Sequence, residues 1–293
     1  FMRIYNPKRW FEILFQFHKS DTLRRLSLVI VLMSVYTWVI AYIELNFLNL
    51  SEKSYVTNIY QMHNLLGFAL SLLLVFRTNT AYDRWWEGRK IWGELVNTSR
   101  NMALKMNSLL DKNDEDNRAF FKDAIPMYAS VLKDHLQSEY TRYSLDEADH
   151  PELKQIDGTK HAPNQIASMM SDRLVLLQKQ GKLTGEQLLF VNDNLNAFTD
   201  ICGKCERIKN TPIPYSYTAF IKKFIFIYIM TLPFGYVFTL QYLVVPVVAF
   251  VFYVLASLEL IAEEIEDPFG HDANDLPMAK LASNIRKNVN EIL

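Results

Sequence analysis

The two cysteines are the first candidates for chemistry, because they form the pattern Cys202-Gly203-Lys204-Cys205. A C-x-x-C pair is typical of thiol–disulfide exchange, in which a thiol of lowered pKa is the nucleophile. No βαβ pattern surrounds the pair, no second cysteine pair completes a zinc site, and no two histidines stand at ligand spacing. A glycine-rich nucleotide loop is also missing from the sequence. The alternatives are a membrane-anchored redox protein that uses both thiols, or two incidental thiols near a helix end, and the second is favoured.

A cluster of carboxylates near the C-terminus is the second candidate. Its members are Glu263, Glu264, Glu266, Asp267, Asp272 and Asp275. Calcium is bound by carboxylate and carbonyl oxygens of this kind. The favoured alternative is structural: the acids cap a helix predicted around 277–292 and pair with Lys280, Arg286 and Lys287.

An apolar stripe on a predicted helix is the third candidate. Phe68, Leu72 and Phe76 are spaced four residues apart, so they lie on one face of a helix. Gly67 and Ser71 lie on a neighbouring face and permit close helix approach. One interpretation is packing against lipid or another helix. The other is a hydrophobic constriction, formed when several copies of this helix surround an axis.

The elements that carry these residues are membrane-spanning helices. The run 26–43 holds no charged residue, 60–76 is a second apolar run, and 224–258 holds no charge over 35 residues. The last run is too long for one span and contains Pro233 and Pro246, so we divide it near Gln241 into 224–240 and 242–258. The sequence therefore predicts four spans, against the alternative of buried helices in a large water-soluble protein.

Basic residues sort to one side of these spans. Arg24 and Arg25 precede the first run, Arg77 follows the second, and two lysines precede the third, whereas the loop between the first two runs holds only Lys53. The positive-inside rule places both termini and the middle segment in the cytoplasm. We expect the membrane to be the cell inner membrane.

The middle segment 77–223 is predicted to be helical and continuous with the second span. A polar break falls at 111–117, a loop is expected at 146–164, and Gly181 is expected to end one helix. Thr184 and Gln187 form a capping box that opens the next helix. Together these patterns predict an all-α membrane protein with segments 1–76, 77–223, 224–260 and 261–293.

Composition excludes several classes of function. The chain has 293 residues, a formal net charge of −1 and 50% hydrophobic residues. It is too apolar to be disordered, and its balanced charge gives no sign of nucleic-acid binding.

Three stretches of this sequence resemble the bestrophin family. They are FRTNTAYDRWWEGRKIWG at 76–93, CERIKNTPIPYSY at 205–217 and EDPFGHDANDLP at 266–277. They stand in the family's order, and the resemblance covers nearly the whole chain. The signature positions within them are Arg84, Trp85, Trp86, Pro212, Pro214, Asp267 and Pro268.

The resemblance implies a homopentameric channel whose axial pore is lined by the second span. The family's hydrophobic neck maps onto Phe68, Leu72 and Phe76. Arg84 and the two tryptophans after it either shape the potential of a cytoplasmic vestibule or, as is favoured, pack between subunits while the arginine meets a carboxylate.

The resemblance also implies a second, cytosolic constriction, which we place at Glu186. Bestrophins tend to have an apolar residue at this position. A ring of five glutamates would attract cations, and their mutual repulsion would raise the pKa values of some of the glutamates. The alternative is a solvated glutamate at a helix N-terminus. Asp272 and Asp275 match acidic positions of the calcium clasp of animal bestrophins, but His271, Ala273 and Asn274 depart from it.

These observations favour a channel that is not an enzyme and needs no cofactor, with calcium at Asp272 and Asp275 in doubt. We expect passive conduction of monovalent ions, leaning to cations such as sodium. The alternatives are a chloride channel of the same architecture, the redox protein, and a non-conducting helical scaffold. The expected partners are four further copies of the chain, membrane lipid and permeant ions, and no nucleic acid.

Overall fold

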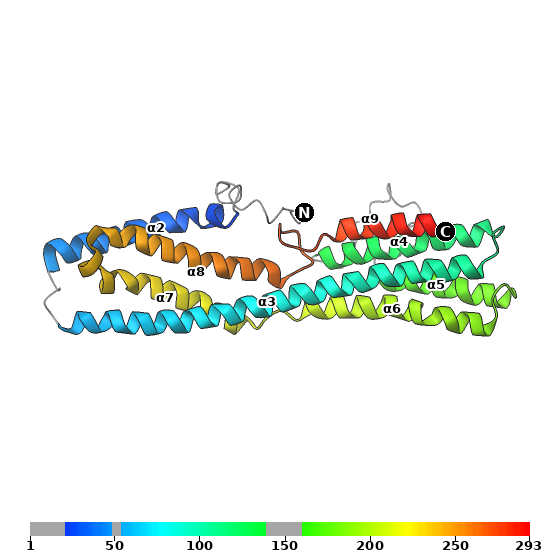
Figure 1. Ribbon diagram of the computed structural model, residues 1–293, viewed down its shortest axis with the longest axis horizontal. Coiled ribbons are helices and arrows are strands. Elements are labelled where there is room, and N and C mark those ends of the chain that lie inside the picture. Colours follow the sequence, from blue (N-terminus) through cyan, green and yellow to red (C-terminus); the bar gives the residue numbers. More distant parts are fainter. Residues whose placement is uncertain (1–20, 49–53, 139–159) are drawn as a thin grey trace. The chain divides into compact units, whose positions relative to one another are not determined.

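The computed structural model describes residues 21–48, 54–138 and 160–293, and every regular element in these ranges is helical (Figure 1). The longer helices are α2 (Asp21–Ile43), α3 (Ser54–Leu109), α4 (Glu115–Gln137), α5 (Ala162–Lys179), α6 (Gly185–Asn210), α7 (Tyr215–Leu240), α8 (Val244–Glu266) and α9 (Met278–Ile292). The described ranges contain no strand, which confirms the predicted all-helical class. The N-terminal part of segment 1–76, Lys53, and the predicted loop as far as residue 159 lie outside the described residues.

Helix α3 is a single element of 56 residues. It passes through the junction of Phe76 and Arg77 without a break, as the sequence predicts. It ends at Leu109, just before the polar run 111–117, and α4 begins at Glu115. One helix therefore carries both the apolar stripe and the polar signature that follows it.

The chain divides into two compact units, and α3 contributes to both. One, here called the apolar unit, comprises the described residues up to Asp83 together with 213–266. The other, the polar unit, comprises residues 84–212 and 267–293, as far as they are described.

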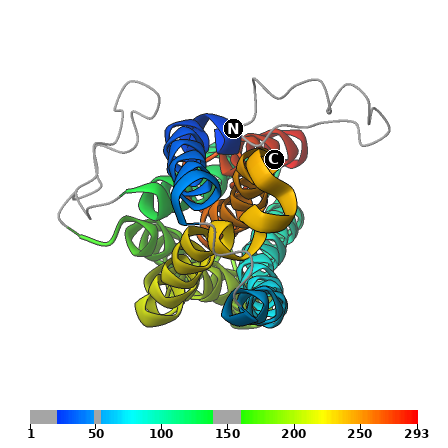
Figure 2. The same cartoon turned by 90° about the vertical axis from the view of Figure 1, so that its left-hand side faces the viewer.

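The apolar unit is built from α2, α7, α8 and the first part of α3. Figure 2 shows α2 (blue), α7 (yellow) and α8 (orange) beside one another, and each of the three contacts the other two. Their shared core includes Met33, Leu70, Ile225 and Phe252. Three described stretches are long and apolar enough to span a membrane, Thr22–Leu48, Ile59–Leu109 and Tyr215–Glu266. Within the third, the chain reverses between α7 and α8 (Figure 1), and Gln241 in this connection has a positive φ of 50°.

The polar unit packs α4, α5, α6 and α9 around a core to which α3 contributes Trp92 and Leu95. Helix α5 begins at Ala162, inside the predicted loop, because Pro163 stands in its first turn, where a missing N–H carries no penalty. Gly181 adopts a φ of 72° after α5. The capping box that opens α6 is confirmed: Gln187 N donates to Thr184 Oγ1 at 3.2 Å, and Thr184 N to Gln187 Oε1 at 2.9 Å.

Candidate functional site

The apolar stripe lies on the free side of α3. Phe68, Leu72 and Phe76 are 69%, 47% and 56% exposed within the single chain. The buried positions of the same helix segment are His63, Leu70, Leu74, Arg77 and Ala81. At about 100° per residue the two sets centre about 180° apart on the helix. The stripe side chains therefore do not pack in the hydrophobic core of their own chain.

The free side of α3 becomes polar immediately after the stripe. Asn79 and Asp83 are exposed and follow Phe76 by three and seven residues, so they share its face. Sequence analysis did not single out these two residues, although their helical spacing from Phe76 was the available signal. One continuous face thus runs from three large apolar side chains to an amide and a carboxylate.

The neighbouring face of α3 packs closely on α7. A Cβ on Gly67 would lie 2.7 Å from the hydroxyl oxygen of Tyr228, and Ser71 Oγ donates to Gly67 O at 2.8 Å. This contact agrees with the predicted close helix approach at Gly67, and it lies within the apolar unit.

Residues from all three signature stretches meet inside the apolar unit at Arg77. The guanidinium is fully buried; its Nη2 lies 2.6 Å from Glu266 Oε2 and its Nε 3.5 Å from Glu259 Oε2. Glu266 Oε1 also accepts the backbone N–H of Ile213 at 2.7 Å. A single carboxylate thus joins α3, the α6–α7 connection and the end of α8.

The same three stretches meet again inside the polar unit. Arg84 donates to the backbone carbonyls of Thr211 and Ile208 at 2.5 and 2.6 Å, and the carboxylate partner stays a prediction. These carbonyls end α6, and a cation is favoured there by the helix dipole. Trp85 Nε1 donates to Asn274 O at 2.9 Å. The absence of a side chain at Gly88 allows the turn at 268–269 to pack closely on α3. A Cβ on Gly88 would lie 3.2 Å from the side chains of both Pro268 and Phe269.

The signature prolines lie in the short connection after α6. Pro214 is the N-cap of α7, and Pro212 lies two residues after Asn210, the last residue of α6. Trp86, next to Trp85, is about half exposed, so the two tryptophans of the signature have different surroundings.

Glu186 lies in the first turn of α6 and is exposed. This position fits both a pore-facing residue and a carboxylate placed favourably at a helix N-terminus. The nearest cation in sequence, Lys182, is paired with Asp114 at 2.7 Å. Leu189 and Phe190, on the same helix, are large apolar side chains that remain exposed in the single chain.

The turn after α8 uses its carboxylates to hold its own backbone. Asp275 is buried, and its Oδ2 accepts the backbone N–H of Asp272 at 2.5 Å. Asp267 Oδ1 likewise accepts from Phe269 N at 3.3 Å. Calcium needs about six to eight oxygen ligands, and these interactions occupy part of the carboxylate set. Calcium at Asp272 and Asp275 stays a prediction.

Glutamates just before this turn pair with partners that sequence analysis did not name. Glu263 pairs with Lys222 at 2.9 Å, and Glu264 with Arg25 at 2.9 Å. Both partners flank apolar runs, so these two glutamates help to hold the ends of α2 and α7.

The two cysteines do not have the properties of a redox pair. Both are buried free thiols on α6. Burial and the nearby charge of Glu206 raise the pKa of Cys202 to about 12, and burial also raises the pKa of Cys205. Thiol exchange requires the opposite shift. Sequence spacing also missed that His135 and His161 approach Cys202.

Comparisons with known proteins agree with these features. The family model "Bacterial/Fungal Bestrophin protein" matches residues 2–291. A voltage-dependent anion channel-forming protein of Nostoc is 32% identical over 97% of this chain and 92% of its own length. Another of that name from Synechocystis is 34% identical over 78% of this chain and 75% of its own. The crystal structure of a bacterial bestrophin homologue from Klebsiella pneumoniae matches with a TM-score of 0.76 and 25% identity, covering 90% of this chain and 98% of that one.

Proposed function

Because this chain belongs to the bacterial and fungal bestrophin family, we propose that it forms a homopentameric ion channel with helix α3 of each subunit lining the pore. Monovalent ions cross passively, and no residue acts as a catalyst. The observation that carries the proposal is the position of Phe68, Leu72 and Phe76, exposed and opposite the face that α3 buries in its own subunit.

Rotational symmetry turns this exposed stripe into a neck. Five copies of α3 around one axis would place three rings of apolar side chains in succession, and such a constriction resists wetting. Asn79 and Asp83 on the same face would rehydrate an ion as it leaves the neck. An abrupt change of polarity within one helix is what this passage from membrane to vestibule requires.

The proposed membrane arrangement has four spans, in α2, α3, α7 and α8, with both termini and the polar unit in the cytoplasm. Its support is the run of apolar helices together with the basic residues that flank them. The proposed location is the cell inner membrane.

We propose selectivity for cations such as sodium, from the charges that the free faces carry. Asp83 and Glu186 are exposed acids, and rings of carboxylates attract cations. The second candidate is an anion channel of the same architecture. It is favoured by the names of the Nostoc and Synechocystis relatives, which are called anion channel-forming proteins.

The decisive measurement is current through the purified protein in a planar bilayer under a sodium chloride gradient. A reversal potential near the sodium equilibrium potential supports the cation channel, and one near the chloride potential supports the anion channel. Flux in liposomes separates both from a non-conducting scaffold, and flux that survives replacement of both cysteines by serine removes the redox alternative.

The neck assignment has its own test. The double variant Leu72→Ala/Phe76→Ala should conduct several-fold better, because it removes part of the barrier to wetting. The matched control is Phe226→Ala/Leu258→Ala, which truncates a phenylalanine and a leucine of α7 and α8 that are 53% and 41% exposed. Equal conductance of the two double variants, both assembled as pentamers, would show that the stripe does not limit the current.

A further inference from the structure

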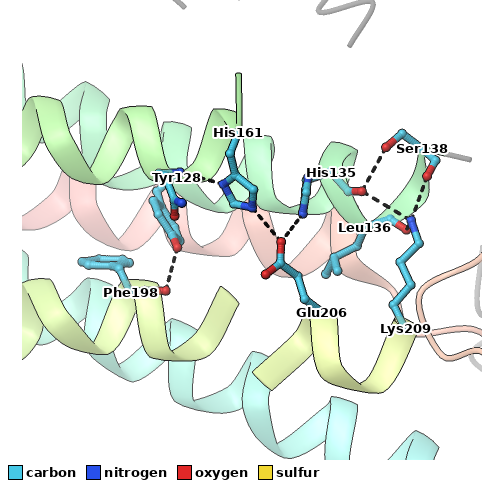
Figure 3. A network of polar contacts seen from close by, with 9 residues as sticks. Tyr128, His135, Leu136, Ser138, His161, Phe198, Glu206 and Lys209 are labelled. Atoms are coloured by element: carbon cyan, nitrogen blue, oxygen red, sulfur yellow. Dashed lines mark hydrogen bonds and ion pairs between the residues drawn. The ribbon is translucent and has the colours of Figure 1, made fainter. Parts of the chain in front are cut away.

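Four potential metal ligands converge inside the polar unit from α4, α6 and the N-terminus of α5. Figure 3 shows three of them, with the two imidazoles of His135 and His161 turned toward the carboxylate of Glu206. They are His135 on α4, His161 at the N-cap of α5, and Cys202 and Glu206 one turn apart on α6. One ligand atom from each lies within 4.8 Å of all the others. We propose that these four side chains hold a zinc ion that ties the three helices together.

The donor set favours zinc over the other common divalent ions. Two imidazole nitrogens, one sulfur and one carboxylate oxygen suit a borderline-soft ion, whereas calcium and magnesium prefer oxygen alone. Thiolate and carboxylate together would balance the charge of Zn²⁺. Four protein ligands fill a tetrahedral site and leave no position for substrate, which is the pattern of a structural zinc site.

The geometry requires small movements. Glu206 Oε1 lies between the imidazoles, 2.5 Å from His135 Nε2 and 2.6 Å from His161 Nε2. Zinc bonds of about 2.0–2.3 Å place tetrahedral ligand atoms about 3.3–3.6 Å apart. Each nitrogen would therefore move away from the carboxylate oxygen by roughly 0.7–0.8 Å, and the farthest pair of ligand atoms would approach by at most about 1.5 Å. Side-chain torsions can supply both movements.

Metal binding requires neutral imidazoles, an ionised carboxylate and a thiolate. The Cys202 thiol must lose its proton to solvent as zinc binds, and the ion itself supplies the charge that stabilises the thiolate.

Binding has one identifiable cost at His161. Its Nδ1 accepts the backbone N–H of Asn164 at 3.2 Å, so its Nε2 carries the proton in the neutral ring. A zinc ion at Nε2 needs the proton on Nδ1 and breaks this N-cap bond. The loss of one N-cap hydrogen bond is a small cost beside the four metal–ligand bonds that a structural zinc site forms.

Neighbouring contacts hold the ligands in place. Tyr128, one of the residues drawn in Figure 3, donates its hydroxyl to Phe198 O at 2.6 Å and lies against the Cys202 thiol. Lys209 Nζ donates to the carbonyls of Leu136 and Ser138, both at 2.7 Å, and so holds the end of α4 that carries His135.

The test measures zinc and cobalt binding by the purified full-length protein in detergent. The protein is first stripped of metal by chelation, then supplied with zinc and dialysed. We expect elemental mass spectrometry to find one bound zinc per chain. Cobalt(II) should give a thiolate-to-cobalt charge-transfer band. Cys202→Ser should abolish that band. Both Cys202→Ser and Glu206→Gln should lower the affinity for zinc by at least about 100-fold. The matched control is Cys205→Ser, another buried α6 thiol, which should keep both signals.

Several outcomes would overturn the assignment. It fails if the protein binds no zinc above background, or if Cys202→Ser binds zinc as tightly as Cys205→Ser. It also fails if bound cobalt shows no charge-transfer band, and this spectrum uses the unmodified protein, so it does not depend on whether any variant folds. Ion conduction enters none of these readouts, so a failed zinc site and a failed channel proposal are distinguishable.

Discussion

Replacing Arg77 by methionine should destabilise the apolar unit strongly, although methionine fills a similar volume. The substitution leaves Glu266 and Glu259 without the cation that lies 2.6 and 3.5 Å from them. Glu259 is buried and Glu266 nearly so, so neither carboxylate gains much solvent when the partner is removed. Breaking a buried ion pair on one side costs about 3–5 kcal/mol.

A surface pair supplies the matched control. Lys222→Met also replaces a cation by methionine, but Lys222 and its partner Glu263 are each about half exposed. Water and salt screen such pairs, and their loss costs about 0–1 kcal/mol. The contrast between the two methionine variants therefore isolates burial from charge.

The assay is equilibrium unfolding in mixed micelles, followed by tryptophan fluorescence. The double variant Arg77→Met/Glu266→Gln should be more stable than the sum of the single effects by about 0.5–3 kcal/mol, because no orphan charge remains at residue 266. The glutamine still accepts the Ile213 N–H through its amide oxygen. An Arg77→Met variant within about 1 kcal/mol of the unmodified protein, or strict additivity in the double variant, would refute the reasoning.

Three further predictions concern other parts of the molecule. Glu186→Gln should shift the reversal potential away from sodium if the side chain faces the pore, and an unchanged potential in a folded channel would remove it from the ion path. Gly67→Ala should destabilise the protein by about 1–3 kcal/mol, because the added Cβ meets a tyrosine hydroxyl of α7. Gly203→Ala should instead stabilise the protein by about 0.5–1 kcal/mol, because the space around Gly203 is open. Thermal melting of both variants checks these expectations. The hydrogen bond from Lys182 lowers the pKa of Asp114 below its ordinary value of 3.8. The Lys182–Asp114 pair therefore contributes its full stability above pH 3.8 and loses it as the pH falls through the pKa of Asp114 in the folded state. The difference in melting temperature between the unmodified protein and Asp114→Asn should therefore be small at neutral pH and vanish in acid, and a difference that grows in acid would contradict the sign.

Some features depend on local patterns, and these were predictable from the sequence. The capping box at Thr184, the left-handed Gly181 and the unbroken helix through Phe76 and Arg77 each depend on residues within one or two helical turns. Period and chemistry are enough for such features. Family membership was predictable for a related reason, because the signature stretches are contiguous in the chain.

Partners across the sequence were not predictable. The guanidinium of Arg84 donates to two backbone carbonyls more than 120 residues away, and no local pattern indicates these acceptors. Glu264 and Glu263 pair with Arg25 and Lys222, which are distant in the sequence. Side-chain pairing depends on which helices become neighbours, and the charge pattern of one segment does not contain that information.

The chemistry of the cysteines shows the same division. The sequence by itself determined that Cys202 and Glu206 share one face of a helix, because four residues make about one turn. It also determined that the stripe of Phe68, Leu72 and Phe76 lies on one face of α3. Only the tertiary structure decided that this face is the one left uncovered, and that His135 and His161, 26 residues apart, meet at Glu206. Helical periodicity specifies which residues share a face, whereas burial of apolar surface decides which faces meet, and that free energy is summed over the whole fold.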